Sequence, residues 1–97
     1  MAIKFDYNQT VNQAKLLDEL ANDMQTQCIK KMDEIRDNIQ AAWTGEAASA
    51  YVKYIVGVQG DLTKKVKYIK DTAEFLRTAA KQMKEAEASA KQSVAKI

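Results

Sequence analysis

The sequence predicts an all-α protein, namely an antiparallel helix-turn-helix hairpin that dimerises into an elongated four-helix bundle. The 97 residues contain no proline and only three glycines, which argues against a β-rich chain with many turns. Apolar residues make up 46% and charged residues 29%, a balance typical of a folded protein. Apolar side chains recur with a helical period on both sides of a single break at residues 42–45, so we expect one helical-hairpin domain over residues 1–97.

The first helix is predicted over about residues 8–41, with Asp6 or Asn8 as its N-cap. At about 100° per residue its apolar side chains fall within an arc of about 80°, opposite a charged face. Leu16 and Leu20 lie beside this arc. Cys28 lies at its centre, where a free cysteine is expected to be buried like a small apolar residue. The residues of this stripe that we expect at an interface are Leu17, Met24, Cys28 and Ile35.

The break at residues 42–45 is predicted to be the turn of the hairpin. Trp43 is expected to plug its end, and Gly45 permits a tight turn. Thr44 is the predicted N-cap of the second helix, and Glu46 places a negative charge in the first turn, where it suits the helix dipole.

The second helix is predicted over about residues 46–88. The interface residues that we expect from its apolar stripe are Tyr51, Tyr54, Val58 and Leu62. Beyond Met83 the chain is rich in helix formers but nearly lacks large apolar side chains, so we expect the tail to residue 97 to fray.

The apolar stripes are wider than a single pair of helices needs, which favours a second hairpin packed face to face. Gly57 and Gly60 each cost about 1 kcal/mol relative to alanine, and we expect them at a close helix crossing in the centre of the dimer. Tyr68 and Phe75 lie beyond one edge of the stripe, Val52 and Val56 beyond the other. The two aromatic residues either pack in the dimer interface or anchor another partner.

Composition excludes several kinds of site. Without histidine and with one cysteine, the chain cannot form His-based acid/base pairs or a multi-cysteine zinc site. We expect no catalytic residue, no metal, no cofactor and no enzyme activity. The net charge of +2 requires no nucleic-acid partner, and none is expected. The cluster of lysines in the second half is interpreted as a solvated face, and it comprises Lys64, Lys65, Lys67 and Lys70.

The amino terminus has no apolar core of a signal peptide, and no run of about 18 apolar residues could span a membrane. Composition alone therefore indicates a cytoplasmic protein.

The midpoint of the chain gives a more specific indication. Trp43-Thr44-Gly45 lies between two amphipathic helices in a chain of about one hundred residues. In length, helical pattern and the position of this turn, nearly the whole chain resembles the WXG-100 family, small proteins exported by type VII secretion systems. The resemblance implies a dimeric four-helix bundle, secretion without a cleaved signal peptide, and a membrane ATPase as the export partner. It also implies that Trp43 and Gly45 belong to a recognition surface beside the carboxyl-terminal end of the partner hairpin.

One feature of many members is missing. A Tyr-x-x-x-Asp/Glu motif is not found after the second helix, and Tyr68-Ile69-Lys70-Asp71 is one residue short. This departure favours the homodimeric, firmicute-type members, although a related WXG protein could instead be the partner and supply the signal.

Three functions stay open at this point. The first is a secreted, non-enzymatic dimeric interaction module with a virulence-associated or export-partner role. The second is an intracellular helical adaptor or chaperone. The third is a membrane-active helical protein, which wide stripes suited to mutual packing disfavour, so we do not expect membrane binding.

Overall fold

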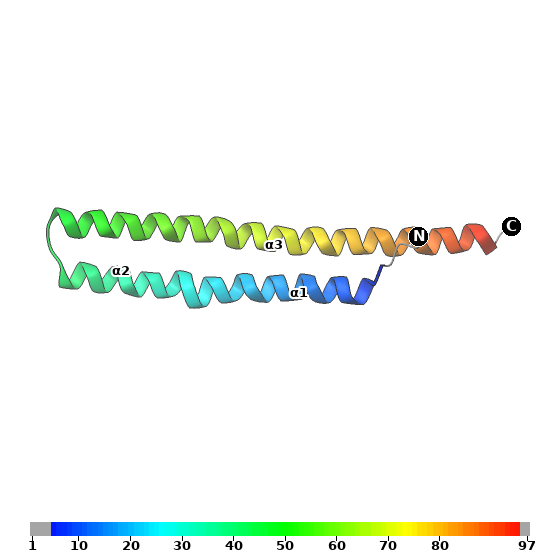
Figure 1. Ribbon diagram of the computed structural model, residues 1–97, viewed down its shortest axis with the longest axis horizontal. Helices are drawn as coiled ribbons and strands as arrows, with labels where there is room; N and C mark the ends of the chain where they lie inside the picture. Colours follow the sequence, from blue (N-terminus) through cyan, green and yellow to red (C-terminus); the bar gives the residue numbers. More distant parts are fainter. Residues whose placement is uncertain (1–4, 96–97) are drawn as a thin grey trace.

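In the computed structural model, which describes residues 5–95, the chain forms a long helical hairpin (Figure 1). The first arm consists of α1 (Tyr7–Asp23), the π-helical segment η1 (Met24–Ile29) and α2 (Lys30–Ala42), and the second arm is α3 (Glu46–Ala95). The radius of gyration is 22.2 Å, whereas a compact domain of this length would have about 13 Å. The predicted all-helical class and the hairpin are therefore confirmed.

The first arm begins at a side-chain cap. The backbone N–H of Gln9 donates to Oδ1 of Asp6 at 3.0 Å, so of the two predicted caps the structure has Asp6. From there the arm continues without a break through η1 into α2. The π-helical segment was not predicted, because residues 24–29 contain no proline or glycine that would mark an irregularity.

The turn between the arms comprises residues 43–45. The N–H of Trp43 still donates to the carbonyl of Ile39 at 2.9 Å, but Trp43 itself is extended and ends the helix. Gly45 has φ +101°, a conformation that costs other residues strain. Since α3 begins at Glu46, the residue before the helix is Gly45, and the prediction of Thr44 as N-cap is wrong.

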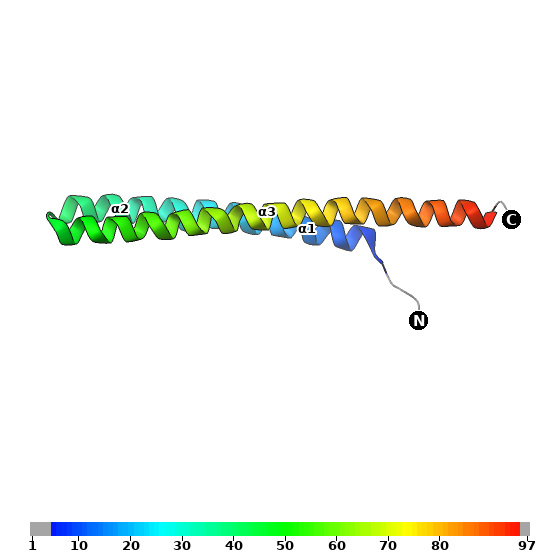
Figure 2. The same cartoon turned by 90° about the horizontal axis from the view of Figure 1, so that it is seen from above.

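Helix α3 extends well past the start of the first arm (Figures 1 and 2). Lys84 Nζ lies 4.4 Å from the ring centroid of Tyr7, the first residue of α1, so about eleven residues of α3 have no helix beside them. The tail was expected to fray beyond residue 88, but the helix continues to Ala95. Alanine, glutamate and lysine dominate this stretch, and their high helix propensity supports a helix without packing. Residues 96 and 97 of the predicted tail lie outside the described residues.

The contact line between the two arms, here called the seam, is built from small side chains. The residues buried there are Ala14, Ala21, Ala48, Val66, Ala73 and Ala80. Spacings of seven residues, as in Ala14–Ala21 and Val66–Ala73–Ala80, are those of a coiled coil. Among the described residues no apolar side chain larger than valine is buried. The hairpin therefore closes by near contact of its backbones and leaves its large apolar side chains partly in water.

Candidate functional site: the two flanks of the hairpin

One side of the seam carries the polar contacts between the arms, and it is here called the polar flank (Asp18, Asp33, Gln59 and Arg77). Arg77 of α3 forms an ion pair with Asp18 of α1, and its Nη1 donates to Glu74 on its own helix at 3.2 Å. The hydrogen bond to Asp18, helped by the one to Glu74, raises the pKa of Arg77 above its usual value. These contacts tie the arms together and hold them in register.

Gln59 is the one buried polar side chain among the described residues, with 8% of its surface exposed. Its Nε2 donates to the backbone carbonyl of Ile29 at 3.0 Å and to Oδ1 of Asp33 at 2.7 Å. A buried amide is stable only when it is hydrogen-bonded, and here both of its N–H groups can be used. Gln59 therefore connects α3 to the junction between η1 and α2.

The other side of the seam is apolar. Helical projection places large apolar side chains of both arms on the side opposite the Asp18–Arg77 pair. This surface is here called the apolar flank, and it comprises Leu17, Leu20, Met24, Ile35, Trp43, Tyr51, Tyr54, Val58 and Met83. Leu20 is 49% exposed, Tyr54 72% and Tyr51 56%, so much of this surface meets solvent in the single hairpin.

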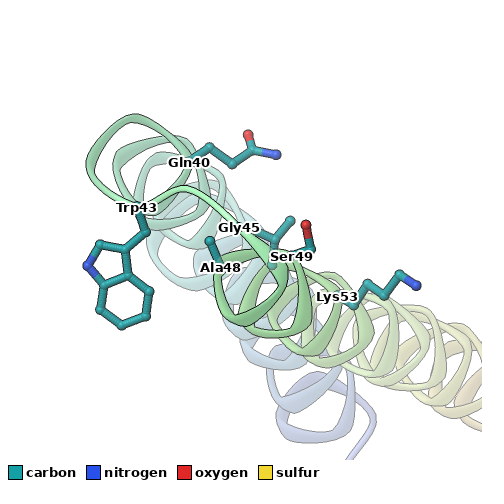
Figure 3. A pocket seen from close by; sticks show the side chains of 7 residues that line it. Gln40, Trp43, Gly45, Ala48, Ser49 and Lys53 are labelled. Atoms are coloured by element: carbon teal, nitrogen blue, oxygen red, sulfur yellow. The ribbon is translucent and has the colours of Figure 1, made fainter.

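At the turn the two flanks are seen end-on in Figure 3. Trp43 points to one side, while Gln40, Ser49 and Lys53 point to the other around a shallow hollow. The Trp43 ring meets the ring of Tyr51 edge to face, with centroids 5.4 Å apart. Trp43 is half exposed, so it does not plug the end of the hairpin as predicted. Instead it extends the apolar flank to the tip.

The predicted interface residues fall into three groups. Half-buried beside the seam are Leu17, Met24, Val58 and Leu62. Exposed are Cys28, Ile35, Tyr51, Tyr54, Tyr68 and Phe75. Gly57 and Gly60 are also exposed, and a Cβ added to either would meet nothing within 4 Å. The hairpin itself thus contains no close crossing at these glycines, and their place in a dimer stays a prediction.

The prediction that Cys28 is buried is wrong for the single hairpin. The π-helical segment turns Cys28 and Ile35 outward, whereas Ile29 and Arg36 take half-buried positions. No feature of the sequence marks Gln59, because a lone glutamine beside an apolar stripe is ordinary in an exposed helix.

The described residues show features of a contact surface. Within residues 5–95 no three His, Cys, Asp or Glu side chains gather in a way that could hold a metal ion. In that same part of the chain, no helix has the length and apolar character needed to cross a bilayer. The arrangement presents a long apolar strip bounded by polar contacts, which is suited to packing against another protein surface.

Comparison with known proteins identifies the family. A family model described as WXG100, proteins of 100 residues with WXG, matches residues 2–88, and this range includes both arms and the Trp43-Thr44-Gly45 turn. The family is associated with small helical proteins of type VII secretion. Searches of curated proteins and of solved structures give no match. Because the matched range covers most of the chain, the protein belongs to the WXG100 family.

Proposed function

We propose that the protein is a substrate of a type VII secretion system and acts as a homodimeric, non-enzymatic protein-interaction module. The observation that carries this proposal is the apolar flank, which runs along the hairpin from Trp43 at the turn to Met83 near the start of the first arm. Monomeric proteins rarely expose a continuous apolar surface of this length.

The hairpin has enough surface for an interface of standard size with a second hairpin. A stable interface buries about 800 Å² on each partner, and the hairpin exposes 7785 Å² in total. An interface of that size would therefore cover about a tenth of the surface of each chain. At about 25 cal/mol per Å² of apolar area, this burial is the main driving force available to so thin a molecule.

The chemistry of the flank also fits a copy of the same chain. In the α3 row of Tyr51 and Val58, Lys65 is the one charged residue, so two identical flanks would meet with few like charges. Each would bring leucine, methionine and aromatic side chains, which pack against their own kind. A related WXG100 protein is the alternative occupant, and it becomes an outcome of the test.

The dimer is tested by size-exclusion chromatography with light scattering at micromolar concentration. We expect twice the chain mass of 10.9 kDa. A well-ordered species of single-chain mass would contradict the homodimer, and recovery of a dimer only after a second WXG100 protein is added would identify a heterodimer.

Export is tested in the source bacterium by deleting the membrane ATPase of its type VII system. We expect the protein to disappear from the culture fluid and to accumulate in the cells. Unchanged export in the deletion strain would reject the secretion part of the proposal, and absence from the fluid of both strains would support an intracellular adaptor.

The role of the turn is tested with Trp43→Ala. Because Trp43 is half exposed, its removal costs mainly the contact with Tyr51, about 0.5–1.5 kcal/mol. If the turn is part of an export surface, secretion should fall more than this loss of stability explains. Secretion that falls only in step with the free energy of unfolding would make the turn purely structural.

A further inference from the structure

We propose that the π-helical segment η1 and Gln59 together set the rotation of α2, so that the apolar flank continues without a break along the whole first arm and can receive a second copy of this chain. The identity of that partner rests on the proposed function. The rotation itself rests on the positions of side chains before and after η1.

The π-helical segment adds one residue to the helical repeat. The N–H of Lys30 donates to the carbonyl of Gln25, five residues back, where an α-helix would use the fourth. Side chains after such a segment are turned by about one residue, or about 100°, relative to an uninterrupted α-helix.

Burial along the arm shows this change. Ala14 and Ala21 are fully buried in the seam and lie seven residues apart. The next member at the same spacing would be Cys28, but Cys28 is exposed and Ile29 is half-buried instead. Seven residues later Arg36 is half-buried, whereas Ile35 is 46% exposed. The row that faces α3 therefore takes a step of eight residues across η1.

This step decides which residues continue the apolar flank. With the step of eight, the row of Leu17 and Met24 continues through Met32 and Ile39, and both are half-buried beside the seam. Without it, the same row would continue through Lys31 and Asn38. For this row, the sequence therefore supplies apolar residues only when α2 is rotated.

A second row of the flank gives the same result. With the step of eight, Leu20 is followed by Cys28 and Ile35. Without it, the row would continue through Gln27 and Glu34. A regular helix would thus bring polar and charged side chains onto the surface that a second hairpin would cover, and burying them unpaired would oppose association.

Gln59 holds the rotated state. Its two hydrogen bonds reach the carbonyl of Ile29, the last residue of η1, and the carboxylate of Asp33 in the first turn of α2. In a regular helix the place of Asp33 opposite Gln59 would be taken by Met32, which offers no comparable acceptor. Gln59 is a positioning residue, because it acts on the flank through η1 and projects to the other side of the seam.

The test is insertion of one alanine after Gln27, an exposed residue of η1, which shifts α2 by one position against α1 and brings polar side chains into the flank. Deletion of Gln27 is the matched control, because Ile29 then lies seven residues after Ala21 and a regular α-helix keeps the rows of the wild type. We expect both variants to stay helical by circular dichroism. The insertion should raise the Kd of the dimer at least tenfold, and the deletion should leave it unchanged.

The single cysteine reports the rotation directly. In the wild type, a thiol reagent should label Cys28 rapidly in the dilute monomer and slowly in the dimer, since Cys28 lies in the row of Leu20. In the insertion variant a step of eight residues from Ala21 reaches Cys28, so Cys28 moves into the row of Ala21 and labelling should be slow at every concentration. An unchanged Kd together with wild-type labelling would overturn the inference.

Gln59→Leu provides a second test should the insertion prevent folding. Leucine fills the space but cannot donate to Asp33, so the Kd of the dimer should rise at temperatures far below the melting transition. If the melting temperature falls while the Kd stays the same, Gln59 stabilises only the hairpin and the inference is overturned.

The labelling measurements distinguish a failure of the homodimer from a failure of the proposed rotation of α2. A wild-type protein that is labelled rapidly at every concentration would reject the homodimer of the proposed function. Slow labelling of the insertion variant would still establish the rotation in that case.

Discussion

The two flanks of the hairpin use opposite chemistry along the same seam. On the polar flank, Asp18 pairs with Arg77 and Gln59 donates to Asp33, so polar groups of the two arms satisfy each other. On the apolar flank, Leu20 and the aromatic side chains of both arms remain about half exposed or more. The polar flank therefore has its contacts satisfied within one chain, whereas the apolar flank leaves apolar surface in water that a partner could cover.

Two charge substitutions, one on each flank, should differ most strongly in their effect on the Kd of the dimer. Leu20 and Val56 are 49% and 48% exposed in the single hairpin, but Val56 projects to the side of the polar flank. In Leu20→Glu an unpaired carboxylate would be buried in the dimer, at a cost of at least about 3 kcal/mol, or more than 100-fold in Kd. Val56→Glu should leave the Kd within about threefold, because a surface substitution away from an interface changes little.

Analytical ultracentrifugation of both variants over a concentration series measures these effects. Equal weakening by the two substitutions would mean that the flanks do not differ in function. Weakening by Val56→Glu alone would place the partner on the polar flank.

The turn joins the two flanks and should be the most sensitive point of the hairpin backbone. Gly45 has φ +101°, and nothing lies within 4 Å of an added Cβ, so Gly45→Ala introduces backbone strain without a steric clash. Strain of this kind costs about 1–3 kcal/mol. Urea unfolding monitored by circular dichroism should show this loss, with Thr44→Ala as a control near the wild-type value. A stability of Gly45→Ala equal to that of the control would show that the turn relaxes without cost.

The sequence predicted the hairpin and its turn well because both depend on local signals. The apolar period, the cap at Asp6 and the glycine at position 45 each act within a few residues. It did not predict the assignment of side chains in α2, because a π-helical segment leaves no local mark and shifts every residue after it. Cys28 and Ile35 were therefore placed in the stripe of Ala21, whereas the structure turns them outward.

The continuation of α3 to Ala95 has a different cause. Helix propensity and lack of packing compete in the tail, and the sequence alone did not decide between them. The hydrogen bonds of Gln59 could not be foreseen either, since they join residues 26 and 30 positions apart. Contacts of that kind become visible only after the two arms are placed in register.

Gly57 lies on the outer side of α3, away from the apolar flank. Gly57→Ala should stabilise the hairpin by about 0.5–1 kcal/mol, because alanine is a better helix former and meets open space at this position. Since Gly57 projects away from the apolar flank, the Kd of the dimer should stay the same. Thermal unfolding and sedimentation of Gly57→Ala and Gly60→Ala measure the two quantities. A more stable hairpin with a weaker dimer would place the predicted close crossing at these glycines.

The polar flank should give the smallest effect, and one that does not depend on pH. Arg77 and Asp18 keep about a third of their side-chain surface in water, and exposed ion pairs contribute little to stability. The hydrogen bond with Asp18 raises the pKa of Arg77 in the folded state. Arg77 therefore makes its whole contribution to the free energy of unfolding at any pH below its pKa in the unfolded chain, and this contribution is lost only as the pH rises through its pKa in the folded protein. Both values lie above the range in which the protein would be handled.

Arg77→Gln should therefore lower the free energy of unfolding less than Gly45→Ala does, and by the same amount at about pH 6, 8 and 10. Glutamine keeps most of the length and a hydrogen-bond donor toward Asp18 but removes the charge. Urea titrations of wild type and variant at the three pH values give the difference directly. A difference that disappears by pH 10 would mean that Arg77 loses its proton far earlier than the pair with Asp18 allows. A loss larger than that of Gly45→Ala would make the polar flank, and not the turn, the main determinant of hairpin stability.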